Sequence, residues 1–148
     1  MFLSRQTLPR LSGTGKDALN GGYIISDSEK KVPDIILMAS GSEVSLIVAA
    51  KEALKKEGID ARIVSMPCME LFDAQNAKYK ESVLPAKVRA RLAVEAGAKM
   101  PWYKYVGLDG DVIGMETFGA SAPAKQLFVK FGFTVENVVE KAKAVLGK

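Results

Sequence analysis

The fold class is set by one stretch of the chain, Ile35-Ile36-Leu37-Met38-Ala39-Ser40-Gly41-Ser42-Glu43. Its first five residues form a continuous apolar run of strand length, which is typical of a parallel strand that is covered on both faces. The serines, the glycine and the acid that follow are typical of the start of a helix. Apolar residues at helical spacing then continue to Leu54, and Gly58 ends the segment. A buried strand followed directly by a helix indicates an α/β domain.

The same alternation of strands and helices continues toward the C-terminus. Besides the strand at 35–39, we expect strands at 23–25, 61–66, 91–94 and 112–115. We expect further helices from Asp73 to Leu84, at 102–106, from Pro123 to Phe131, and from Thr134 onward. Parallel strands of one sheet are joined by right-handed crossovers. The order therefore predicts a three-layer α/β fold, with a mainly parallel, twisted sheet of about five strands and helices on both faces.

Residues 1–21 differ from the rest of the chain. The glycines of Ser12-Gly13-Thr14-Gly15 and of Gly21-Gly22 supply flexible, turn-forming backbone. We interpret 1–21 as a linker and 22–148 as the domain proper. Gly13-Thr14-Gly15-Lys16 has some likeness to a phosphate-binding P-loop, but a P-loop needs Gly at position 10 and Ser or Thr at position 17. Those positions hold Arg10 and Asp17, so we do not predict a P-loop.

The composition restricts the chemistry that this chain carries. Its 148 residues include one cysteine, Cys68, and no histidine. The lack of histidine excludes Ser–His and Cys–His catalysis and leaves few ligands for zinc. We therefore predict no catalytic residue and no metal site, and we interpret Cys68 as a small hydrophobic residue of the core. A lone cysteine and the lack of an apolar run of ~18 residues favour a cytoplasmic protein without a membrane span.

The net charge of +4 is a weak indication of nucleic-acid binding. The best basic stripe is Lys87, Arg89 and Arg91, whose alternation places them on one face of a strand. No aromatic residue lies between them, as base stacking would require. We interpret them as the solvated start of a strand and expect no nucleic-acid partner.

Ligands of open α/β sheets bind beyond the carboxyl ends of the strands. Three such ends are Ser40-Gly41-Ser42, Met66-Pro67-Cys68 and Glu95-Ala96-Gly97. The first is a candidate anion site, because free N–H groups lie at a helix N-terminus there. Glu43 in the same turn would repel a phosphate, and ordinary helix capping by the serines is the preferred interpretation. Glu95 is either a carboxylate with a perturbed pKa or a residue paired locally.

Several motifs, in order along the chain, resemble transketolases. Leu3-Ser4-Arg5-Gln6-Thr7-Leu8-Pro9 is similar to the end of their middle, pyrimidine-binding domain, and Ala39-Ser40-Gly41-Ser42-Glu43-Val44 to the first strand-to-helix turn of their C-terminal domain. The match covers essentially the whole chain. It continues through Arg62-Ile63-Val64-Ser65-Met66-Pro67, Val94-Glu95-Ala96-Gly97, Trp102-Tyr103-Lys104-Tyr105-Val106-Gly107, Thr117-Phe118-Gly119-Ala120-Ser121-Ala122-Pro123 and Phe131-Gly132-Phe133-Thr134.

The resemblance implies the C-terminal domain of an enzyme that transfers a two-carbon ketol unit between sugar phosphates in the pentose phosphate pathway. Full-length members are cytoplasmic homodimers that hold thiamine diphosphate with a divalent metal, magnesium or calcium, between their N-terminal and middle domains. The Gly-Asp-Gly motif of that cofactor site is absent here, and Gly107-Leu108-Asp109-Gly110-Asp111 is only a lookalike. The resemblance implies that this chain alone binds no cofactor, and that Arg5 binds the substrate phosphate in the full-length enzyme.

Three functional interpretations stay open. In the first, the chain is a structural and assembly domain, inactive alone, whose partners are the N-terminal and middle domains of the same enzyme. In the second, it is a regulatory module that binds a nucleotide or a sugar phosphate at Ser40, Gly41 and Ser42. In the third, it belongs to a transketolase encoded as two chains, although 148 residues are too few to include the middle domain.

Overall fold

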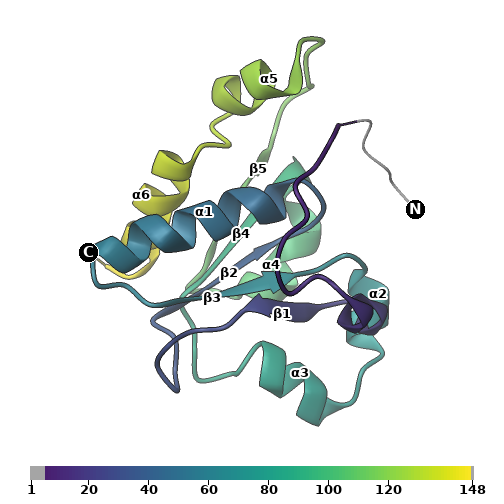
Figure 1. Ribbon diagram of the computed structural model, residues 1–148, viewed down its shortest axis with the longest axis vertical. Helices are drawn as coiled ribbons and strands as arrows, with labels where there is room; N and C mark the ends of the chain where they lie inside the picture. The colour runs from purple at the N-terminus through teal and green to yellow at the C-terminus, as the bar shows by residue number, and fades with distance from the viewer. Residues whose placement is uncertain (1–5, 148) are drawn as a thin grey trace.

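A five-stranded sheet forms the centre of the computed structural model, which describes residues 6–147 (Figure 1). Its spatial order is β1-β3-β2-β4-β5. Only β1 is antiparallel to its neighbour, β3, and the other three pairings are parallel. The predicted α/β fold with about five mainly parallel strands is confirmed. The strands are β1 (Tyr23–Ser26), β2 (Ile35–Ala39), β3 (Ala61–Ser65), β4 (Arg91–Ala98) and β5 (Asp111–Met115).

The apolar run that predicts the fold is the central strand β2, and all five of its residues are fully buried. Successive side chains of a strand point to opposite faces. Ile35, Leu37 and Ala39 therefore enter one hydrophobic cluster, and Ile36 and Met38 enter the other. The sheet thus has an apolar layer on each face, and each layer needs a cover of helices.

Helices cover both faces, as expected for three layers (Figure 1). The first cluster contains buried residues of α1 (Glu43–Lys56) and α6 (Val135–Val145). The second contains residues of α2 (Met69–Asp73), α3 (Ala77–Val83) and α4 (Tyr103–Val106). Trp102, at the end of the short 3₁₀ helix η2 (Met100–Trp102), is 1% exposed and is the largest fully buried side chain of the second layer.

The single helix predicted from Asp73 to Leu84 is wrong. Asp73 ends α2, and a new helix, α3, starts after Asn76. The backbone of Asn76 is extended, and its side-chain oxygen accepts a hydrogen bond from the Tyr79 N–H at 2.9 Å. Because Asn at an N-cap satisfies a helical N–H that has no partner inside the helix, it begins a helix better than it continues one.

The predicted linker contains a structured element. Lys16–Asn20 forms a 3₁₀ helix, η1, which our sequence analysis did not predict. Gly21 follows it with φ of +81°, and a Cβ there would lie 2.3 Å from the Phe72 backbone nitrogen. Only glycine fits this left-handed conformation and this close approach. Gly21 therefore lets the chain that follows η1 pack directly against the backbone of α2.

An arm, residues 116–130, projects from the body of the molecule beyond β5 (Figure 1). It consists of a loop and the helix α5 (Ala124–Lys130), which has no buried residue. Phe118 in the loop is 99% exposed and Val129 on α5 is 70% exposed. The arm therefore presents large apolar side chains that nothing in the described chain covers.

Candidate functional site

Three strand ends meet at one edge of the sheet. β3, β2 and β4 are parallel neighbours, so their carboxyl ends lie side by side. This brings together Ser40, which follows β2, Ser65, which ends β3, and Glu95 of β4. The Ser40 hydroxyl donates to Glu95 Oε2 at 2.7 Å across 55 residues of sequence. The predicted common edge is therefore present, and it has a carboxylate at its centre.

Glu43 is the most buried acid of this edge, at 4% exposure. Its carboxylate accepts hydrogen bonds from the Ser42 hydroxyl and, at 3.4 Å, from the Ala96 N–H. Burial raises the pKa of Glu43 above its ordinary value, and these two hydrogen bonds oppose that effect. The predicted capping by serine is wrong, because Ser42 at the N-cap makes no side-chain cap bond. Its hydroxyl is oriented to Glu43 instead.

Glu95 is the second acid of the edge. Burial raises its pKa, the hydrogen bond from Ser40 opposes this, and the negative charge of Glu43 raises it further. The sequence left open whether Glu95 has a perturbed pKa or a local partner. In the structure it has both, since Ser40 is its partner and its pKa is raised. Strand order predicts that the turns holding Glu43 and Glu95 share this edge, but the influence of one acid on the other depends on tertiary packing, because the two are far apart along the chain. Two neighbouring carboxyls, which repel an anion when they are ionised, make this edge a poor place for a phosphate.

A cavity of about 300 Å³ lies between the start of α1 and the N-terminal segment, residues 6–15, and neither Glu43 nor Glu95 lines it. We refer to it as the edge cavity. Gly41 and Ser42 of the predicted anion site line it, whereas Ser40 does not. Ser65 and Pro67 line it from the end of β3. The remaining lining residues are Leu8, Pro9, Arg10, Leu11, Thr14, Ala18, Tyr23, Ile25, Val44 and Ser45.

Cys68 is not a core residue, contrary to prediction. It is partly exposed, and its Sγ lies 3.4 Å from Glu70 Oε2. Cys68 occupies the N-cap position of α2, directly after the turn that leaves β3. A residue in such a turn lies at the sheet edge and not in an apolar layer, which explains the error.

Arg91 is not solvated, contrary to our interpretation of the basic stripe. Its half-buried guanidinium donates to the carbonyl oxygens of four residues, Leu84, Pro85, Val88 and Tyr105. Arg89 pairs with Asp109 at the surface. Arg91 thus ties the loop before β4 to the end of α4, which is a structural use of its charge.

Arg5, which the resemblance assigns to the substrate phosphate, lies outside the described residues. Within 6–147, no three Asp, Glu, Cys or His side chains gather where they could hold a metal ion. No helix of that part of the chain has the length and apolar character to cross a membrane.

Comparison with known families gives a match over most of the chain. Residues 21–134 match the family model described as the transketolase-like C-terminal domain. The chain is 56% identical over 149 residues to "Transketolase 1" of Vibrio vulnificus strain YJ016, and 54% identical to "Transketolase 1" of Escherichia coli K12. Each match covers 99% of this chain but 22% of the relative. The chain therefore spans about a fifth of the length of these relatives.

Solved structures agree with the sequence comparison. The chain superposes on transketolase from Leishmania mexicana with a TM-score of 0.88 and 43% identity, covering 97% of this chain and 20% of that one. It matches transketolase from Pichia stipitis, solved in complex with sedoheptulose 7-phosphate, with the same TM-score and 41% identity. A split-gene transketolase, solved as an inactive β4 tetramer, shares the fold at a TM-score of 0.72 and 17% identity.

Proposed function

Because the chain belongs to the family of transketolase-like C-terminal domains, we propose that it serves the assembly of a transketolase and not its chemistry. The observation that carries this proposal is the extent of the match, which takes in nearly all of this chain and only 22% of the relative. The sequence also holds no histidine, so any proton transfer by imidazole must come from another part of the enzyme.

The exposed arm supports an assembly role. Phe118 and Val129 place large apolar area in solvent at the end of a projection that adds little to the core. Exposed apolar residues that gather on one feature mark interaction surfaces. The N-terminal segment and the arm rise from the same side of the molecule (Figure 1). We propose that a domain attached before this segment contacts the arm, and we assign the arm to contact with the middle domain.

The activity of the whole enzyme follows from the family. We propose that it transfers a two-carbon ketol unit between sugar phosphates, as a cytoplasmic homodimer in the pentose phosphate pathway. The sugar phosphate bound to the Pichia stipitis relative supports this substrate class. Arg5 would contact the substrate phosphate, because a guanidinium offers a planar pair of donors to phosphate oxygens.

The family resemblance assigns thiamine diphosphate and its divalent metal to other domains of the enzyme, and the Gly-Asp-Gly motif of the cofactor site does not occur in this sequence. The hydroxyls of Ser40 and Ser42 already donate to carboxylates, so they are not available to a phosphate. We therefore assign the cofactor and metal to the N-terminal and middle domains of the enzyme.

An assay of the purified chain tests the assembly proposal. We expect no ketol transfer from xylulose 5-phosphate to ribose 5-phosphate by this chain, with thiamine diphosphate and magnesium present. Full-length transketolase 1 of E. coli, under the same conditions, is the positive control. Turnover by the chain above the background without protein would contradict the proposal.

The regulatory alternative, a nucleotide or sugar phosphate at Ser40, Gly41 and Ser42, has less support. Two acids with raised pKa lie beside this turn, and both serine hydroxyls are engaged with them. Calorimetric titration with a nucleotide and with a sugar phosphate checks it, and we expect no saturable heat from either ligand.

A further inference from the structure

We propose that the edge cavity binds a small amphipathic carboxylate, meaning a compact apolar body with one carboxylate group. This inference is independent of the assembly role, because it rests on the walls of the cavity within this chain. The cavity, at about 300 Å³, lies at the lower limit of the ~300–1,000 Å³ typical of ligand pockets, so the ligand is small.

Ser65 is the polar group that points to a ligand. On β3 it follows Ala61 and Ile63 on the face toward α1, where a third core residue would be apolar. It is only 7% exposed, and no hydrogen bond of its hydroxyl is found within residues 6–147. A buried hydroxyl without a partner is costly, by about 1–3 kcal/mol.

The Ser65 hydroxyl is open to the edge cavity and not sealed in the core. In residues 6–147, no fully enclosed side-chain oxygen or nitrogen lacks a hydrogen-bond partner. The Ser65 oxygen therefore keeps access to space, and the cavity that Ser65 lines provides that space. A ligand oxygen placed there would receive the hydrogen bond that the protein does not supply.

The other polar walls leave few donors. The Thr14 hydroxyl donates to the Leu11 carbonyl at 2.8 Å, and the Ser45 hydroxyl to the Ser42 carbonyl at 2.9 Å. The Ser42 hydroxyl donates to Glu43. Of the five hydroxyls that line the cavity within residues 6–147, three are thus used within the protein, and those of Ser65 and Tyr23 are left. A doubly charged phosphate has three terminal oxygens, and most of them would find no donor here. A carboxylate has only two oxygens, so it needs fewer donors.

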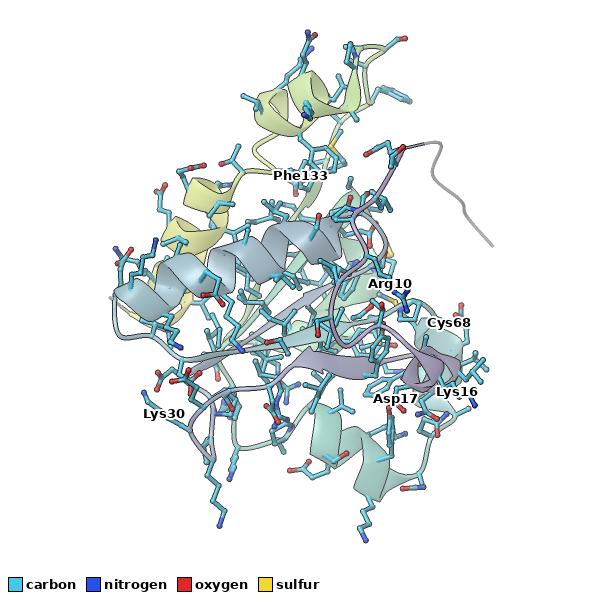
Figure 2. All side chains as sticks on the ribbon, viewed as in Figure 1. Arg10, Lys16, Asp17, Lys30, Cys68 and Phe133 are labelled. Atoms are coloured by element: carbon cyan, nitrogen blue, oxygen red, sulfur yellow. The ribbon has the colours of Figure 1, made fainter. Side chains whose placement is uncertain are left out.

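Charge at the cavity is favourable for one anion. Among the residues of 6–147 that line it, Arg10 is the only charged one, and it is exposed on the N-terminal segment. Figure 2 shows Arg10 and Cys68 at the same end of the sheet, where the carboxyl edge lies. The Glu43 carboxylate points elsewhere, toward Ser42 and the Ala96 N–H, and does not line the cavity. The N-terminus of the 14-residue α1 adds a favourable dipole.

The rest of the cavity wall is apolar, so it favours a ligand whose uncharged part is apolar. The apolar side chains come from both sides of the cavity, so they would enclose a ring or a short branched chain. Burying such a body gains about 25 cal/mol for each Å² of apolar surface removed from water. These side chains are Leu8, Pro9, Leu11, Ala18, Tyr23, Ile25, Val44 and Pro67.

Titration with benzoate, followed by amide chemical shifts of the ¹⁵N-labelled chain, tests the proposal. We expect saturable shifts at Gly41, Ser42 and Ser65 at millimolar benzoate. Benzyl alcohol, which keeps the ring and lacks the charge, should bind about tenfold more weakly, because a charge-assisted hydrogen bond is lost. Phenyl phosphate should also bind more weakly than benzoate.

Two variants locate the site. Ser65→Ala and Arg10→Gln should each weaken benzoate binding about tenfold, because each removes one hydrogen-bond donor to the carboxylate. Lys125→Gln, which removes the same charge from the arm, should leave the affinity unchanged. If benzoate gives no saturable shifts, if the shifts lie away from the cavity, or if Lys125→Gln acts like Arg10→Gln, the proposal is overturned. An unchanged amide spectrum without ligand shows that each variant folds.

Discussion

At the scale of single residues, the buried carboxyl of Glu43 gives a stability that depends on pH. Its pKa is raised by burial, so the folded chain holds this proton more tightly than the unfolded chain does. The stabilisation is complete below the ordinary carboxyl pKa of 4.5 and is lost as pH rises through the folded value. At neutral pH, the folded protein therefore holds a carboxylate in an unfavourable environment.

We expect Glu43→Gln to raise the melting temperature at pH 7, because the neutral amide keeps hydrogen bonds to Ser42 and Ala96 without a buried charge. The gain should shrink as pH falls toward 4.5, where the wild-type carboxyl is protonated too. Thermal unfolding over this pH range measures it. Glu52→Gln, an exposed change of equal charge on the same helix, is the control and should show little effect. A lower melting temperature for Glu43→Gln at pH 7 would contradict this account.

Some neighbours in the site can be predicted from the order of the strands, and others cannot. Strand order alone places Ser40 and Glu95 at one edge, and the structure confirms that neighbourhood. The hydrogen bond from Ser40 to Glu95 spans 55 residues, and the one from Ala96 to Glu43 spans 53. A single sequence carries no signal for such pairings. Ser65 was visible only as the end of a strand, since its lack of a partner is a property of the packed molecule.

At the scale of secondary-structure elements, the start of α6 is a test of local capping. The sequence predicts Thr134 as the cap, and the structure confirms it, with the Asn137 N–H donating to Thr134 Oγ1 at 3.2 Å. Thr134→Ala should destabilise the chain by about 1 kcal/mol, which corresponds to ~2–4 °C in melting temperature for a domain of this size. Thr134→Ser keeps the hydroxyl and should stay near wild type. Equal losses in both variants would contradict the role of the cap.

Strands and helices were predicted correctly where one apolar pattern dominated the segment. The continuous apolar run of β2 and the apolar stripe of α6 are of this kind, and both elements are present. The segment after β3 failed because Asp73 and Asn76 are both good cap residues, three positions apart. Phe72 packs into the second layer in the last turn of α2, and the Asn76 side chain caps the start of α3.

At the scale of the whole molecule, the two apolar layers differ in what fills them, and Trp102 dominates the second. It packs edge-on against Tyr105, with ring centroids 6.4 Å apart. Trp102→Ala should lower the free energy of unfolding by about 3–5 kcal/mol, the usual cost of a large core cavity. Chemical denaturation measures this loss, and Tyr103→Ala on the exposed side of α4 is the control. A loss for Trp102→Ala no larger than that of the control would contradict the packing described here.

The arm should matter for assembly and not for folding. Phe118→Ser removes an apolar side chain that is 99% exposed, so the melting temperature of the chain should change little. The same change in the full-length enzyme should weaken the contact between the arm and the middle domain, which limited proteolysis detects as faster cleavage between the domains. A large loss of stability in the isolated chain would show that the arm belongs to the core.

A replacement experiment shows whether this chain serves the assembly of a transketolase. The C-terminal portion of E. coli transketolase 1 that matches this chain is exchanged for it, and ketol transfer and dimer formation are measured. If this chain is an assembly domain of a transketolase, the chimera forms the dimer and transfers the ketol unit, while the truncated enzyme without either C-terminal portion does not assemble. A chimera that assembles no better than the truncated enzyme would contradict the account.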